Sequence, residues 1–139
     1  MSALCKLLEQ FGPLAGRVLM AYIFVMSGIG KIGGFSATAA AMAGKGIPLA
    51  EVALVITIII ELVAGLMLIV GWQTRLAATA ILLWLIPVTL IFHAYWAVDA
   101  EQVRAQTIQF NKNLAIMGGI LYVMVFGAGP LSLDARRKD

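Results

Sequence analysis

Residues 48–72 read PLAEVALVITIIIELVAGLMLIVGW, an apolar run long enough to cross a bilayer as one helix. The only charged side chain between Glu51 and Arg75 is Glu61, which lies near the middle of the run. An acidic residue at the centre of a membrane helix costs about 2.5 to 3.5 kcal/mol, so Glu61 must face protein, face a polar cavity or carry a proton. Two interpretations have equal weight: a functional carboxyl group, or one that only hydrogen-bonds to a neighbouring helix.

The composition of the whole chain also points to a membrane. Of the 139 residues, 62% are hydrophobic and 12% are charged, and the mean hydropathy is +0.98. Soluble domains of this size are less apolar, so we predict one integral membrane domain over residues 1–139. The net charge of +3 does not indicate nucleic-acid binding, because the basic residues flank apolar spans instead of forming a patch.

The expected fold is an all-α bundle of four transmembrane helices with up-down topology. Ser36 is expected to cap a short interfacial helix that ends at Gly44, between the first two spans. Val98 to Lys112 is expected to be the main polar loop. The four spans are predicted at about residues 13–32, 49–71, 76–96 and 113–129.

Several local features refine these spans. Pro13 suits the first turn of a helix, and the first span is expected to be retained and not removed as a signal peptide. Residues 73–75 are expected to form a tight turn. Pro87 is expected to kink the third span near its middle.

Two basic residues of the first span lie within hydrocarbon depth. Arg17 and Lys31 are about 21 Å apart along a helix, so both are expected to snorkel toward opposite membrane surfaces. For Lys31 an alternative is open. The small residues at Ser27 to Gly30 would let its side chain reach inward, to a neighbouring helix or a ligand.

The distribution of basic residues predicts the orientation. With four spans, the two termini and the turn at residues 73–75 share one side, and that side is richer in Lys and Arg. Both termini are therefore expected to face the cytoplasm.

With that topology, polar side chains from all four spans converge in the outer half of the bundle. Thr89, His93 and Trp96 share one face of the third span, and Glu61 would form the floor of a polar funnel. The candidate ligand-binding residues are Glu61, His93, Lys31, Ser27, Thr57, Thr89, Trp96 and Asn113.

A funnel that closes at mid-membrane suits a ligand with a polar head and a lipid-soluble tail, such as a quinone. A histidine changes charge near neutral pH, so His93 could exchange protons with a quinone oxygen or with Glu61. The alternative for His93 is an interfacial histidine bonded to the backbone, which by itself is the commoner case.

Haem and metal centres are not expected within the chain. His93 is the only histidine, so a bis-histidine haem is excluded, and the seven methionines are more simply core residues than axial ligands. Cys5 is the only cysteine, so an internal disulfide and a cysteine metal site are also excluded.

Three groups of residues resemble the DoxX family of small bacterial membrane proteins. Arg17, Phe24, Ser27-Gly28 and Lys31 match the family's opening pattern of Arg followed by Phe-x-x-Ser-Gly-x-x-Lys. The order and spacing of all three groups together are specific, over essentially the whole chain. The other two groups are the hairpin residues Glu61, Gly65, Gly71 and Thr74-Arg75, and the closing residues Phe92-His93, Trp96, 110–114 and Gly118-Gly119.

The resemblance implies a four-helix protein of the bacterial inner membrane. The family is named from a subunit linked to a thiosulfate:quinone oxidoreductase, and other members are associated with redox stress complexes. Two function classes follow: a quinone-linked accessory or redox subunit served by a partner redox protein, or a non-catalytic component that packs within or assembles a larger membrane complex. The expected surroundings are lipid and a membrane or redox partner, and a homo-oligomer is compatible with both classes.

Overall fold

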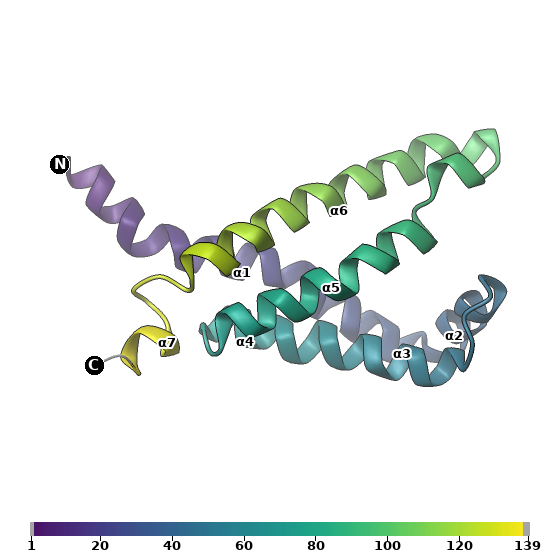
Figure 1. Ribbon diagram of the computed structural model, residues 1–139, viewed down its shortest axis with the longest axis horizontal. Coiled ribbons are helices and arrows are strands. Elements are labelled where there is room, and N and C mark those ends of the chain that lie inside the picture. Colours follow the sequence, from purple (N-terminus) through teal and green to yellow (C-terminus); the bar gives the residue numbers. More distant parts are fainter. Residues whose placement is uncertain (1, 138–139) are drawn as a thin grey trace.

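A computed structural model describes residues 2–137, and these residues form an all-α bundle (Figure 1). The long apolar segments are helical, which confirms the expected all-α fold class. The start of α1 and the short α7 lie at one end of the bundle, and α2 lies at the other. In chain order the elements are α1 (Ala3–Gly33), α2 (Phe35–Gly44), α3 (Ala50–Ile59), the π-helical turn η1 (Ile60–Ala64), α4 (Gly65–Val70), α5 (Thr74–Phe92), the 3-10 turn η2 (Tyr95–Ala97), α6 (Ala100–Phe126) and α7 (Leu133–Arg136).

The long helices are consistent with a protein that crosses a membrane several times. Three segments of the described chain are long and apolar enough to span, namely Ala3–Gly33, Ala50–Val70 and Thr74–Ala97. The second of these is continuous through α3, η1 and α4. The fourth long helix, α6, has 27 residues and so extends about 40 Å, and its first turns are polar.

The first span begins earlier than expected. Helix α1 begins at Ala3, so Pro13 lies inside the helix. The prediction that Pro13 occupies the first turn is wrong. The new start has a local cause, because the Ser2 side chain accepts a hydrogen bond from the Cys5 backbone N–H at 3.3 Å and caps the helix.

The predicted polar loop at Val98 to Lys112 is wrong. Asp99 lies at the N-cap of α6, and the helix continues from Ala100 to Phe126 because no proline or glycine interrupts it before Gly118. The fourth span is therefore part of a longer helix whose polar first half extends the α5–α6 hairpin.

Other boundaries shift by a few residues. The predicted cap Ser36 lies inside α2, which begins at Phe35 after Gly34, whereas the end at Gly44 is confirmed. The turn between the second and third spans was predicted at 73–75 and lies at 71–73, so Thr74 is already the first residue of α5. Pro87 lies inside α5, which is helical from Thr74 to Phe92.

Small residues allow the helices to approach closely around the core. A side chain at Gly65 would come within 2.9 Å of the Val25 side chain. A side chain at Gly28 would come within 2.8 Å of Leu62. These two contacts bring α1 against the second span on both sides of Glu61. The buried core is formed by Ala21, Phe24, Ala64, Leu68, Ala77, Ala78, Ile81, Leu85 and Ile120.

Candidate functional site

Glu61 lies in the π-helical turn of the second span. The i to i+5 hydrogen bonds of η1 add a residue to the turn and rotate the following helix relative to a regular α-helix. The side chain of Glu61 is only 2% exposed and faces α1. Turns of this kind inside longer helices occur frequently at functional sites, and the sequence analysis did not foresee this one.

Two residues of α1 hold the Glu61 carboxylate. Lys31 Nζ lies 2.8 Å from Oε1 and 3.0 Å from Oε2, and Ser27 Oγ donates to Oε1 at 3.0 Å. Ser27 and Lys31 are one turn apart on α1, so they reach the carboxylate from the same face, and Lys31 also donates to Ser27. Glu61 therefore faces protein, one of the environments expected for it, and its polar partners lie on the first span.

This network decides the alternatives left open for Lys31. The structure has the inward-reaching arrangement, and snorkelling, the favoured expectation, is wrong for this residue. Gly28 explains why, because the missing side chain allows α1 to approach so closely that a Cβ there would lie 3.3 Å from Glu61 Cβ. An ammonium next to a buried carboxylate forms the only ion pair within residues 2–137.

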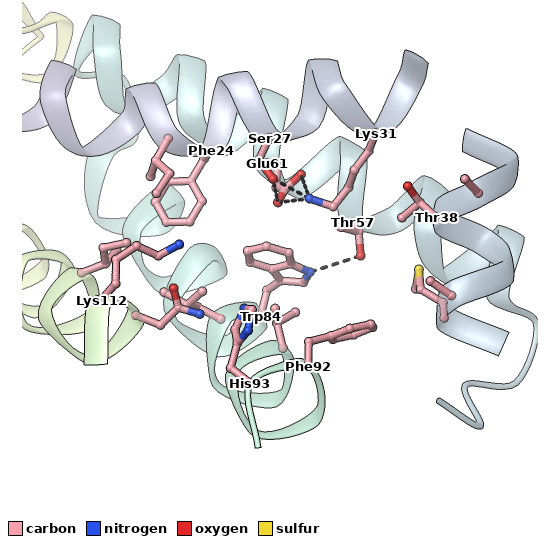
Figure 2. Close-up of a pocket in the computed structure, with 18 residues that line it drawn as sticks. Phe24, Ser27, Lys31, Thr38, Thr57, Glu61, Trp84, Phe92, His93 and Lys112 are labelled. Carbon is pink, nitrogen blue, oxygen red and sulfur yellow. Dashed lines mark hydrogen bonds and ion pairs between the residues drawn. The ribbon is translucent and has the colours of Figure 1, made fainter. Parts of the chain in front are cut away.

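The ion pair forms part of the wall of a cavity of about 500 Å³ between α1, α2, the second span, α5 and α6 (Figure 2). Trp84 lies beside the cavity, and its indole Nε1 donates to Thr57 Oγ1 at 3.2 Å. Phe24 meets Trp84 edge to face, with ring centroids 6.3 Å apart. The lining is thus largely apolar and aromatic, with a few polar groups directed inward.

A second group of polar side chains lines the cavity from α5 and α6. His93 follows the last turn of α5, and its Nδ1 lies 2.9 Å from Gln106 Oε1. Since an amide oxygen only accepts, this contact places the ring proton on Nδ1 and leaves Nε2 for other partners. Lys112 points toward the cavity from α6 and contacts the neutral Gln109 (Figure 2).

The buried residue Asn113 links α6 to α5. Asn113 Nδ2 donates to Thr89 Oγ1 at 3.0 Å, and that hydroxyl donates to the Leu85 carbonyl at 2.7 Å. Thr89 is 2% exposed and lies behind Asn113, so it supports the wall without lining the cavity.

The structure brings together six of the eight candidate residues. Trp96 is the clear exception, because the chain leaves the α-helical path after Phe92. Trp96 is 59% exposed and packs against Tyr95 and Phe110 outside the cavity. The six residues that line the cavity are Ser27, Lys31, Thr57, Glu61, His93 and Asn113.

Sequence reasoning missed other lining residues. Trp84 is one turn before Val88 on the cavity side of α5, and its polar N–H in an apolar span was the available signal. Thr38 and Met42 of α2 also line the cavity, which indicates that this short helix covers part of it. That contribution depends on how α2 folds back, so no local pattern predicts it.

Arg17 closes the opposite end of the bundle, and its predicted snorkelling is wrong. The side chain is 1% exposed. Nη1 donates to the carbonyls of Leu68 at 2.9 Å and Ile69 at 3.3 Å, and Nη2 donates to Leu131 at 2.6 Å. Gly71, with φ +68°, leaves the space for the guanidinium, since a Cβ there would clash with Nη1. The last carbonyls of α4 thus receive a cation that also ties down the C-terminal segment.

Asp134 of α7 completes this closure. Its carboxylate accepts the backbone N–H groups of Gln73 and Thr74, each at 2.8 Å, at the start of α5. Burial acts to raise the pKa of Asp134, but hydrogen bonding by Thr74 and Gln73 and the nearby charge of Arg137 outweigh it. The net pKa lies below its usual value.

Within residues 2–137, no group of three or more His, Cys, Asp and Glu side chains could hold a metal ion. The titratable side chains that line the cavity are two lysines, Lys31 and Lys112, with Glu61 and His93, around an apolar, aromatic space.

Comparison with known proteins adds independent information. The family model described as DoxX matches residues 12–94. Inner membrane protein YphA of Escherichia coli K12 is 32% identical over 123 residues, which cover 88% of each chain. Inner membrane protein YqjF of the same organism is 33% identical over 129 residues, which cover 93% of this chain and 94% of that protein.

More distant similarity extends to eukaryotes. A Surfeit locus protein 4 homolog of Schizosaccharomyces pombe is 27% identical over 132 residues, which cover 94% of this chain but 39% of that protein. No solved structure matches the chain at a significant level.

Proposed function

This chain belongs to the DoxX family and, like its relatives YphA and YqjF, is a multi-pass inner-membrane protein; on that premise we propose that it binds a quinone as an accessory or redox subunit. The observation that carries the proposal is the position of the Lys31–Glu61 ion pair in the wall of an apolar, aromatic cavity. An ion pair in this environment is costly to bury, so its retention beside an open cavity favours a role with a ligand.

A quinone has a flat ring, two carbonyl oxygens and an apolar tail, and each part has a counterpart in the cavity. The edge of Trp84 and the ring of Phe24 offer aromatic contacts for the flat ring. Lys31 Nζ on α1 can donate to one carbonyl oxygen, and Lys112 or Asn113 on α6 can donate to the other. The tail would pass between the helices into lipid.

Reduction of a quinone to a quinol takes two electrons and two protons. We assign the electrons to a partner redox protein, because the chain has a single cysteine and a single histidine. With its Nδ1 proton hydrogen-bonded to Gln106, neutral His93 accepts at Nε2, so it would first take up a proton there and then pass it to one ring oxygen; the ammonium of Lys31, next to Glu61, would supply the second proton.

A second candidate is a structural or assembly component. Two observations favour it. The Ser27–Lys31–Glu61 network joins α1 to the second span without any ligand, and the Asn113–Thr89 bond joins α6 to α5. Under this alternative the same side chains stabilise the bundle, by about 0.6 to 2 kcal/mol for each interhelical hydrogen bond.

Tryptophan fluorescence separates the two candidates. Trp72 and Trp96 lie outside the cavity, so a Trp72→Phe, Trp96→Phe protein retains Trp84 as its single tryptophan and reports from the cavity wall. Added decylubiquinone should quench this emission in a saturable manner. Glu61→Gln and His93→Ala should each weaken the binding about tenfold while the protein stays folded.

The matched control is Glu51→Gln, which changes an exposed carboxylate at the start of α3, away from the cavity. This variant should bind as the parent does. Glu61→Gln and His93→Ala proteins that are less stable but bind quinone unchanged would contradict the quinone proposal and support the structural alternative.

A further inference from the structure

We propose a second ligand site, at the end of the bundle opposite the quinone cavity, that binds the phosphate group of a ligand. A cavity of about 720 Å³ lies where the start of α5, the end of α6 and α7 meet. It includes the Thr74-Arg75 pair of the hairpin motif, for which the proposed quinone site has no use. It is lined by 73–76, 126–130, Ser132, Asp134, Ala135 and Arg137.

The charges in this cavity favour an anion. Arg75 and Arg137 both line it, and among residues 2–137 neither has a carboxylate within 4 Å. The single acidic side chain, Asp134, is engaged by two backbone N–H groups at the start of α5. One carboxylate against two guanidinium groups leaves the cavity with a net positive charge.

The guanidinium of Arg75 is held in place by the protein. Nη2 donates to the Val125 carbonyl at 3.1 Å, which anchors the side chain beside the end of α6. Since a guanidinium has five N–H donors, the others remain for a ligand oxygen, and their planar geometry matches a phosphate. An anchored arginine also loses less side-chain entropy when a ligand binds.

Thr74 keeps the one carboxylate of the cavity occupied. Thr74 is 1% exposed, and its backbone N–H donates to Asp134 Oδ2 at 2.8 Å. The Thr74 hydroxyl also faces this carboxylate and helps to lower its pKa. The donors that remain for a ligand are therefore the guanidinium groups of Arg75 and Arg137.

Apolar side chains next to these polar groups indicate the source of the phosphate. Leu76 near the start of α5 and Phe126 at the end of α6 line the cavity and are 61% and 69% exposed. A phospholipid supplies phosphate and acyl chain together, whereas a free phosphate compound would leave these side chains uncovered.

The test compares three probes by titration calorimetry on delipidated protein in detergent. Dihexanoyl phosphatidylglycerol carries phosphate and chains, dihexanoylglycerol carries the same chains without phosphate, and sodium phosphate has no chains. We expect saturable binding of the phosphatidylglycerol and none of the dihexanoylglycerol. Binding of sodium phosphate with the same dependence on the variants would support the site and assign it to a free phosphate compound.

Neighbouring arginines provide a matched pair of variants. Arg136 and Arg137 are adjacent and exposed, but only Arg137 lines this cavity. Arg137→Gln should weaken phosphatidylglycerol binding about tenfold, and Arg136→Gln less than about twofold, although both remove one positive charge. Arg75→Gln should weaken it at least as much as Arg137→Gln, with quinone quenching of Trp84 unchanged.

Two results would overturn the proposal. Equal losses in Arg136→Gln and Arg137→Gln would mean that the end of the chain attracts anions only through its overall charge. Equal binding of dihexanoylglycerol and the phosphatidylglycerol would mean that the cavity takes acyl chains alone. Neither result bears on the quinone proposal, because the two cavities share no lining residue.

Discussion

The two ends of the bundle each hold a cation from α1, but with different partners. At one end Lys31 pairs with the carboxylate of Glu61, next to an open cavity that also receives Trp84 and His93. At the other end Arg17 donates to backbone carbonyls and lines neither of the two cavities described above. The same sequence feature, a basic residue in a membrane helix, thus has two structural outcomes.

Lys31 and Arg17 differ in whether a ligand could bind to their charged groups. The side chain of Lys31 is 24% exposed and lines the cavity, so a ligand oxygen can share its ammonium group without opening the bundle. The guanidinium of Arg17 is enclosed and bonded to three backbone carbonyls, so a ligand could not share it without displacing them. We therefore assign Arg17 to stability and Lys31 to the candidate site, and the following predictions test that contrast.

The largest expected effect is that of Arg17→Met. The change removes three charge-assisted hydrogen bonds from a fully buried side chain and unties the C-terminal segment, so it should lower the free energy of unfolding by about 3 to 5 kcal/mol. Urea or SDS unfolding in detergent micelles measures this. Quinone quenching per folded molecule should not change, and a loss of binding without a loss of stability would contradict the assignment of Arg17 to stability.

A smaller effect is expected when the ion pair is altered. Lys31→Met leaves the buried Glu61 without its partner and should destabilise by about 1 to 3 kcal/mol. The double variant Lys31→Met, Glu61→Gln removes both charges, so it should recover most of that stability. Quinone binding should remain lost in both proteins. Recovered binding in the double variant would mean that the ion pair has no part in ligand recognition.

The cap made by Asp134 should have an effect of about 0.5 to 1 kcal/mol. Asp134→Asn weakens the two bonds to the start of α5, and the group is partly exposed, which places the effect at the low end for a helix cap. Because the folded state lowers the pKa of Asp134, its contribution is present above the unfolded value and is lost as pH falls through the folded one.

The pH window follows from that sign. The stability difference between the parent and Asp134→Asn should be constant from about pH 5 to 7 and should shrink below about pH 4. Thermal unfolding at a series of pH values measures the difference. A difference that grows as the pH falls would mean that the carboxylate does not act as the cap.

The smallest effect on stability is expected from two cysteine variants that test which side of the membrane the termini face. Lys45→Cys and Arg104→Cys place thiols at exposed positions of the α2 end, and Cys5 at the start of α1 is an exposed native thiol at the other. If the termini face the cytoplasm, a membrane-impermeant maleimide should label positions 45 and 104 in intact spheroplasts. Cys5 should react only after lysis. The reverse pattern would reject the proposed orientation.

Much of the fold could be predicted from hydropathy, because a bilayer requires about 20 apolar residues from each spanning helix. The stretch around Glu61 is such a case. The start of α6 was not predicted, because hydropathy gives no signal for a helix that begins outside the apolar core. Its first turns are polar, and polarity without proline or glycine is as compatible with a helix outside the membrane as with a loop.

The residues of the candidate site could be predicted where only their depth in the membrane matters. Ser27, Lys31 and Glu61 meet because each lies at a depth that spacing along a helix determines. Trp96 was misplaced because the helix ends at Phe92, and the spacing rule that grouped it with His93 applies only while a helix continues.

The sequence by itself determined that this is a membrane-spanning helical protein and that Glu61 needs a partner, because both follow from transfer free energies of the residues themselves. Only the tertiary structure decided that Arg17 and Lys31 face inward. They are separated by nearly four turns and so lie on similar faces of one helix. Which face meets the bundle depends on how closely the neighbouring helices approach, and contacts at Gly28, Gly65 and Gly71 set that approach.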